Sequence, residues 1–134
     1  MKRHLLSILT LIIFLQSCNS GFSIKGKIEN MPEQRFRIEE LGTDENVLID
    51  SGKTNKDGSF AIQSKATEES LYRIKFERGK YILLAVKNGD NAQIAGDWNQ
   101  LENYTVSGSA GSATLKGFLI NLRENIKDIQ TMQV

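Results

Sequence analysis

Apolar and polar residues alternate along much of this chain, and that pattern constrains its fold more than any other feature. In residues 22–28, Phe22, Ile24 and Ile28 fall on one side and polar residues fall on the other. Residues 71–77 repeat the pattern with the same regularity. A period of two is typical of a strand with one buried face. Weaker versions of the alternation occupy residues 35–41, 47–53, 59–64, 91–96 and 103–109.

Turn sequences separate these segments. Residues 55–58, 78–80 and 88–91 combine glycine with asparagine, aspartate or lysine, and glycine supplies the positive φ that tight turns require. Strands that recur at roughly 8–12 residues favour an antiparallel β-sandwich or barrel, here of about 7–9 strands. Residues 81–87 are apolar on both faces, so they are predicted to form a central strand.

The period changes near the end of the chain, where residues 111–134 are predicted to form one amphipathic helix. Ser112 is the predicted N-cap. Apolar residues then recur three or four positions apart and form one stripe. The stripe consists of Leu115, Phe118, Leu119, Leu122, Ile126 and Ile129. A lone helix has to bury such a stripe on the sheet, on a partner or on a further domain.

The first residues have the features of an export signal. Lys2 and Arg3 precede a largely apolar run at 5–15, which as a helix is about 16 Å long. A bilayer core is about 30 Å thick, so the run is too short to span it. Residues 1–17 are therefore predicted to be a signal peptide, followed by a β-sandwich domain at 18–110.

Cys18, the only cysteine, follows that run directly. Leu15 and Ser17 give residues 15–18 a resemblance to the lipobox of bacterial lipoproteins. The resemblance implies cleavage before Cys18, lipid on its sulfur and a stable membrane anchor. It places the protein in the cell envelope, and the absence of acidic residues at 19–25 favours a periplasm-facing anchor. Plain secretion with an incidental cysteine and a buried amino-terminal segment are the competing interpretations.

Composition excludes several classes of function. The net charge is +1 and changes to −1 if Lys2 and Arg3 leave with the signal peptide. Without a block of basic residues, no nucleic-acid partner is expected. The only histidine is His4, so we expect neither a metal site nor a catalytic triad in the folded part. No cofactor is expected either.

Three aromatic residues are the remaining candidates for a ligand site. Tyr81, Trp98 and Tyr104 could form an aromatic platform for a small ligand or a glycan. The competing interpretation of Trp98, which comes directly after a strand, is a turn residue that closes one end of the sandwich. Exposure of all three rings on one face would favour a platform, and burial would exclude it.

Five segments in a fixed order resemble a known domain family. They are residues 22–28, 50–60, 71–74, 94–97 and 104–109, with the helix after them. Together they resemble an amino-terminal β-rich domain of unknown function that precedes a TlpA-type thioredoxin-like domain in envelope lipoproteins of Gram-negative bacteria. The resemblance covers residues 18 to about 132 and implies a membrane-tethered thiol–disulfide oxidoreductase whose reaction occurs in the thioredoxin-like domain.

This chain departs from that pattern because it has no Cys-x-x-Cys, so the family's catalytic residues match no position here. The prediction is therefore a lipid-anchored, non-catalytic module that is not an enzyme by itself. It would serve as an accessory or docking domain and contact a thioredoxin-like domain, or a second copy, through its helix. The uncapped helix end favours a truncated chain. The alternatives are a small-ligand or glycan-binding envelope module and a structural envelope protein that is complete as it stands.

Overall fold

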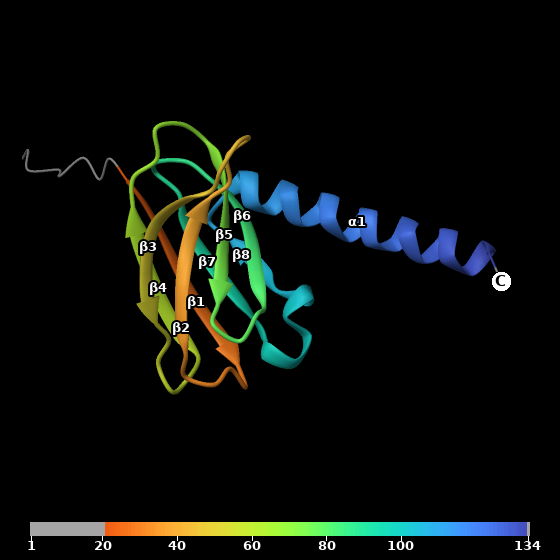
Figure 1. Ribbon diagram of the computed structural model, residues 1–134, viewed down its shortest axis with the longest axis horizontal. Coiled ribbons are helices and arrows are strands. Elements are labelled where there is room, and N and C mark those ends of the chain that lie inside the picture. Colours follow the sequence, from red (N-terminus) through yellow and green to blue (C-terminus); the bar gives the residue numbers. More distant parts are fainter. Residues whose placement is uncertain (1–20, 134) are drawn as a thin grey trace, which may run out of the picture.

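The computed structural model describes residues 21–133 and shows a β-sandwich followed by one helix (Figure 1). Eight strands and the carboxy-terminal helix confirm the predicted mainly-β fold class. The predicted signal peptide and Cys18 lie outside the described residues. The elements are β1 (Phe22–Glu29), β2 (Arg35–Glu40), β3 (Val47–Lys53), β4 (Ser59–Ser64), β5 (Ser70–Phe76), β6 (Tyr81–Val86), β7 (Asn91–Asp97), η1 (Trp98–Asn103), β8 (Thr105–Ser107) and α1 (Ala110–Met132).

Each sheet has four strands. One has the order β4-β1-β7-β8 and the other β3-β2-β5-β6. Every pair is antiparallel except β1 with β7, which run parallel, so the first sheet is mixed. Between β1 and β7 the chain crosses to the second sheet and back twice, with β4 returning to the side of β1 opposite β7.

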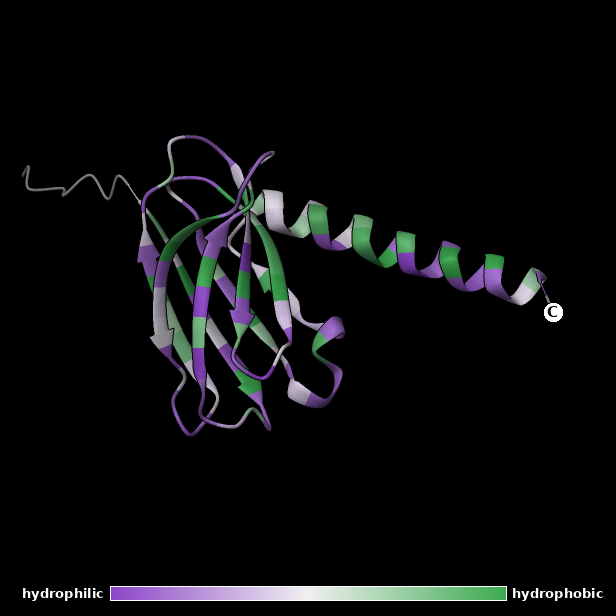
Figure 2. Ribbon diagram, viewed as in Figure 1, coloured by the Kyte–Doolittle hydropathy of each residue, from purple (hydrophilic) through white to green (hydrophobic). Residues whose placement is uncertain are grey.

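The alternating residues meet between the sheets as predicted. Phe22, Ile24 and Ile28 of β1 are buried, and the inward residues of β5 are buried opposite them. Gly26 also points inward, and the ring of Phe60 occupies the space that a larger residue would fill. Figure 2 shows hydrophobic residues at alternate positions along the strands. All buried core residues lie between positions 22 and 104, so the sandwich has a complete core of its own.

The prediction of a central strand at residues 81–87 is wrong. β6 pairs only with β5 and forms the edge of its sheet. It is apolar on both faces because its inner face enters the core and its other face is covered by residues that come after β7. Tyr104 donates a hydrogen bond to the carbonyl of Leu83 (2.7 Å), and Ala85 is buried under the start of α1. Apolar residues on both faces therefore reflect coverage by a helix rather than a central position.

The joint between β8 and α1 corrects a second prediction, because the N-cap is Ser109 and not Ser112. The Ser109 hydroxyl accepts a hydrogen bond from the backbone N–H of Ser112. Gly108 precedes it with φ +74°, and a Cβ there would lie 2.0 Å from the carbonyl oxygen of Asn91. The turn thus requires glycine, and it ends one residue before the cap.

The first strand and the helix begin at the same end of the sandwich. The carbonyl of Asp90 accepts a hydrogen bond from the backbone N–H of Ser23, 3.0 Å away. The carboxylate of Asp90 accepts a second one from the hydroxyl of Ser109, 2.9 Å away. One turn residue therefore contacts both the start of β1 and the cap of α1.

Candidate functional site

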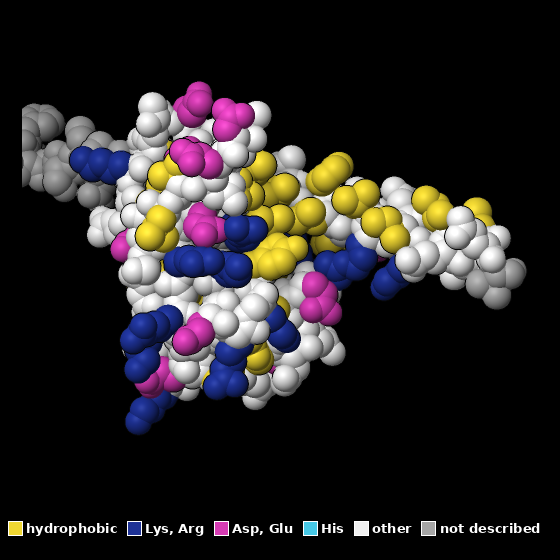
Figure 3. Space-filling view, viewed as in Figure 1, with side chains coloured by type: hydrophobic (Ala, Val, Ile, Leu, Met, Phe, Trp, Pro, Cys, Tyr) yellow, Lys and Arg dark blue, Asp and Glu magenta, His cyan; other side chains and the backbone are white. Residues whose placement is uncertain are grey.

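The most conspicuous surface is the apolar stripe, which comprises Leu115, Phe118, Leu119, Leu122, Ile126 and Ile129 on α1. The helix leads away from the sandwich, and its hydrophobic side chains run along it toward the carboxy terminus (Figures 1 and 3). Phe118 is 61% exposed and Ile129 is 56% exposed. Leu115 and Leu119 are half-buried. Helices in proteins usually gain their stability by packing such a stripe, so its exposed part is a candidate interaction surface.

Polar side chains attach the helix to the sandwich. Ser112 is buried, and its hydroxyl accepts from the N–H of Ala85 (3.1 Å) and donates to the carbonyl of the same residue (2.9 Å). This hydroxyl pairs both backbone groups of Ala85 at the free edge of β6, groups that a neighbouring strand would otherwise bind. Ser112 of α1 and Tyr104, which binds the carbonyl of Leu83, together cover this edge.

Two cations continue the attachment along the helix. Lys116 donates to the carbonyl of Glu102. Arg123 donates to the same carbonyl at 3.0 Å and to the side-chain oxygen of Asn103 at 3.2 Å. Among residues 21–133, Arg123 is the last residue of α1 with a side-chain hydrogen bond to the sandwich.

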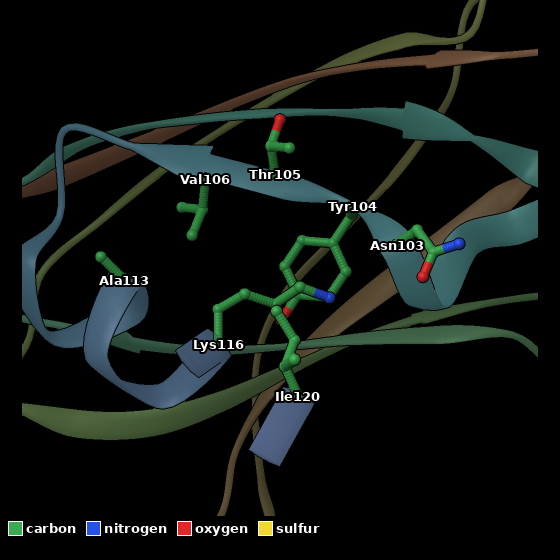
Figure 4. Close-up of a pocket in the computed structure, with 7 residues that line it drawn as sticks. All are labelled: Asn103, Tyr104, Thr105, Val106, Ala113, Lys116 and Ile120. Carbon is green, nitrogen blue, oxygen red and sulfur yellow. The ribbon is translucent and has the colours of Figure 1, made fainter. Parts of the chain in front are cut away.

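Tyr104 and Lys116 form the centre of this junction (Figure 4). The Lys116 ammonium lies 3.9 Å from the centre of the Tyr104 ring, a cation–π contact. Burial raises the pKa of Tyr104 to about 12, so its hydroxyl stays protonated and can donate to Leu83. Burial, together with the nearby charge of Arg123, lowers the pKa of Lys116, although Glu102 opposes that effect. An open pocket of about 340 Å³ beside these residues is also lined by Val106, Ala113 and Ile120.

A groove separates the helix from the hairpin that precedes β6. We call it the α1 groove; its volume is about 490 Å³. It is lined by Gly79, Lys80, Tyr81, Leu83, Leu101, Glu102, Tyr104, Lys116, Leu119 and Arg123. Leu119 belongs to both the groove and the apolar stripe, so the two form one continuous surface.

The three predicted platform residues lie in different environments. Tyr81 is 56% exposed and lines the α1 groove, whereas Tyr104 lines the same groove but is only 5% exposed. Trp98 is half-buried and packs edge-on against Phe76, with ring centres 5.6 Å apart. Lys80 covers its other side, 4.9 Å from the ring. The structure thus brings two of the three rings to one groove, while Trp98 closes an end of the sandwich.

The lipidation residue Cys18 and the lipobox residues Leu15 and Ser17 lie outside the described residues. Within residues 21–133, no group of three or more His, Cys, Asp or Glu side chains is placed to hold a metal ion. No helix in this described part combines the length and the apolar character needed to cross a membrane.

Sequence reasoning missed the residues that hold the helix in place. Ser109 and Ser112 are separated by two residues, which is the spacing of an N-cap and its N3 position. That spacing could have identified Ser109 as the N-cap from the sequence. The pairing of Ser112 with Ala85 had no signal, because the partners are 27 positions apart and belong to different elements.

Comparison with protein families matches residues 22–115 to one described as Domain of unknown function (DUF4369). The matched range covers the whole sandwich and ends at Leu115, in the second turn of α1. Most of the apolar stripe therefore lies beyond it. No curated protein matches the chain.

Proposed function

The chain belongs to the DUF4369 family, and we propose that it is a lipid-anchored, non-catalytic docking module of the cell envelope. The observation that carries the proposal is the exposed part of the apolar stripe, which stays uncovered although the sandwich has a core of its own. It consists of Phe118, Leu122, Ile126 and Ile129. A surface of this kind is a helix-in-groove ligand, with anchors at three- and four-residue spacing. Its occupant in this proposal is a thioredoxin-like domain, the partner that the sequence resemblance implies.

Two features support a catalytic role for such a partner and a docking role for this chain. The described residues contain no cysteine, so thiol–disulfide exchange would have to occur in the partner. The helix is held by hydrogen bonds from Ser112 to Arg123, which orient the stripe before any partner arrives. Preorganisation of this kind reduces the entropy cost of binding.

The docking experiment uses a chain that begins at Asn19, which keeps the whole core, and a purified TlpA-type thioredoxin-like domain. Sedimentation equilibrium of the mixture is expected to show a one-to-one complex. The double variant Leu122→Asp/Ile126→Asp places two charges in the stripe and is expected to abolish the complex. The matched control Gly117→Asp/Asn121→Asp adds the same charge on the opposite face, where nothing lies within 4 Å of a Cβ at Gly117. Equal loss in both variants would contradict docking through the stripe.

Two further measurements test the remaining parts of the proposal. Thiol–disulfide exchange by the chain alone should not exceed a no-protein control, and clear activity would refute a non-catalytic role. The mass of the mature amino terminus should correspond to a lipid-modified Cys18. An intact Met1 or an unmodified cysteine would refute the anchor. If the chain alone formed a stable homodimer that buries the stripe, the occupant would be a second copy of this chain and not a thioredoxin-like domain.

A small-ligand or glycan-binding role is the second candidate, and the α1 groove favours it. Tyr81 is exposed there beside Leu83 and Leu119, an arrangement that suits stacking of a sugar ring on an aromatic face. Titration with neutral disaccharides, followed by amide NMR shifts, would test it. Shifts confined to residues 79–83 and lost in Tyr81→Ala would support the role, whereas a flat response would exclude those sugars as ligands.

A further inference from the structure

The outward faces of the two sheets differ sharply in charge. On β4-β1-β7-β8, cross-strand register places two lysines and two carboxylates among serine, alanine, glutamine, asparagine and threonine. On β2, β3 and β5, it places five cations against two carboxylates. The five cations are Arg35, Arg37, Lys53, Arg73 and Lys75, and Figure 3 shows Lys and Arg side chains spread over this face.

Four of these cations line one depression, which we call the basic concavity. Its side chains are Arg35 and Arg37 of β2, Ser51 and Lys53 of β3, and Lys75 and Glu77 at the end of β5. Its volume is about 810 Å³, within the range of small-molecule sites, about 300–1,000 Å³. Four positive charges share this space with one carboxylate, so its electrostatic character is that of an anion site.

Register sets cations directly opposite one another in this concavity. Arg35 of β2 faces Lys53 of β3, and Arg37 faces Lys75 of β5 on the other side. Like charges at directly opposed positions, about 5 Å apart at Cβ, destabilise a sheet. Two such pairs on adjacent strands are unfavourable for folding alone, and an anion between them would remove the repulsion.

Neighbouring carboxylates neutralise only part of this charge. Lys53 pairs with Glu33 at 2.5 Å, and Arg37 pairs with Glu39 at 3.1 Å. Glu39 also binds Arg73, which holds the pKa of its carboxyl below the usual value. Arg35 and Lys75 form no ion pair within residues 21–133, so both remain available to a ligand.

We propose that the basic concavity binds a soluble ligand that carries a multiply charged phosphate group, on a body about the size of a sugar. Arginine donates two parallel hydrogen bonds to phosphate oxygens, lysine adds a point charge and Ser51 can donate from its hydroxyl. A carboxylate carries a single charge and would compensate only one of the two cations that have no ion pair, Arg35 and Lys75. The site is separate from the apolar stripe and does not depend on the docking proposal.

The test is a calorimetric titration of the chain that begins at Asn19 with inorganic diphosphate at low salt. The double variant Arg35→Gln/Lys75→Gln removes the two cations that have no ion pair among the described residues. It is expected to weaken diphosphate binding about tenfold or more, since each charge-assisted bond contributes substantially. The control Lys25→Gln/Lys65→Gln removes the same charge from exposed positions elsewhere and should bind diphosphate like the parent chain.

A second readout separates ligand binding from a structural role. Without diphosphate, Arg35→Gln/Lys75→Gln should be as resistant to urea as the parent chain, or more so, because a repulsion is relieved. Lower stability in that variant would make these cations structural and overturn the proposal. If the control variant lost as much diphosphate affinity, the effect would come from net charge alone, and the proposal would be overturned. Binding to anionic vesicles without binding of diphosphate would also overturn the proposal, because it would identify a membrane-facing surface instead.

Discussion

The amino-terminal part of α1 is bound to the sandwich, whereas its carboxy-terminal part is exposed. In its amino-terminal part, up to Arg123, the helix binds the sandwich through polar groups of Ser112, Lys116 and Arg123. In the second half, Ile126 and Ile129 are about half exposed and Met132 is 84% exposed. An amphipathic helix normally buries its apolar face and exposes its polar one. Here polar side chains make the hydrogen bonds to the sandwich, and only Leu115 and Leu119 of the apolar stripe are half-buried, while its other residues are exposed.

Among substitutions that weaken the attachment of α1, Ser112→Ala is expected to lower the free energy of unfolding most. Ser112→Ala removes the hydroxyl that pairs the N–H of Ala85, and no other group among residues 21–133 accepts from that N–H. A buried N–H without a partner costs about 1–3 kcal/mol of the free energy of unfolding. Urea unfolding followed by circular dichroism measures it, with the exposed Ser107→Ala as control. A change below about 0.5 kcal/mol would mean that the edge of β6 does not need this cover.

A smaller loss in the free energy of unfolding is expected at Tyr104. This residue binds the same edge of β6 at Leu83, two residues before Ala85. Tyr104→Phe removes the hydrogen bond to Leu83 and should cost about 1 kcal/mol. Tyr72→Phe is the matched control, because the Tyr72 hydroxyl is buried with no hydrogen-bond partner within the described residues. Its removal should be neutral or slightly stabilising. Equal effects of the two substitutions would show that ring packing, rather than the hydrogen bond, holds this region.

The same tyrosine predicts a pH dependence. Its pKa is raised from 10.0 to about 12 in the folded chain, so the unfolded chain ionises first as the pH rises. The stabilisation is complete below pH 10 and is lost between pH 10 and about 12. Urea midpoints of the parent chain and Tyr104→Phe should therefore converge over this window. A constant difference would contradict the raised pKa.

The smallest expected effect is in the second half of the helix. Ile126→Asp/Ile129→Asp should change the free energy of unfolding by less than about 0.5 kcal/mol, since both side chains are exposed. The comparison is sharpest when this variant is measured beside Ser112→Ala. If the isoleucine variant were the less stable of the two, the second half of the helix would contribute to the fold, and the contrast between the halves would fail.

Sequence patterns identified most of the fold because burial in a sandwich alternates with the strand. Strands β1, β3 and β4 begin where the alternation predicted, and the helix was recognisable from its change of period. Residues 81–87 misled the prediction because apolar residues on both faces do not reveal whether a strand or a helix covers them. The parallel pairing of β1 with β7 has no local signal, since it depends on how the chain crosses between sheets.

The candidate surfaces were harder to predict, for a physical reason. The apolar stripe is periodic within one helix, so its residues could be named from the sequence. The basic concavity combines Arg35 and Arg37 with Lys53 and Lys75 from three strands, and only the register brings them together. Net charge concealed it, because the positive face is balanced by acidic residues elsewhere. The α1 groove likewise required the angle at which the helix leaves the sandwich.

The contacts of Asp90 with both Ser23 and Ser109 have a geometric consequence for the anchor that we propose. A domain that the chain enters and leaves at the same end adds almost none of its own length to the distance between its two flanking segments. The sandwich would lie to one side of the line between these two segments and would not lengthen it. The reach of the module is then set by its 23-residue helix, about 35 Å at about 1.5 Å per residue.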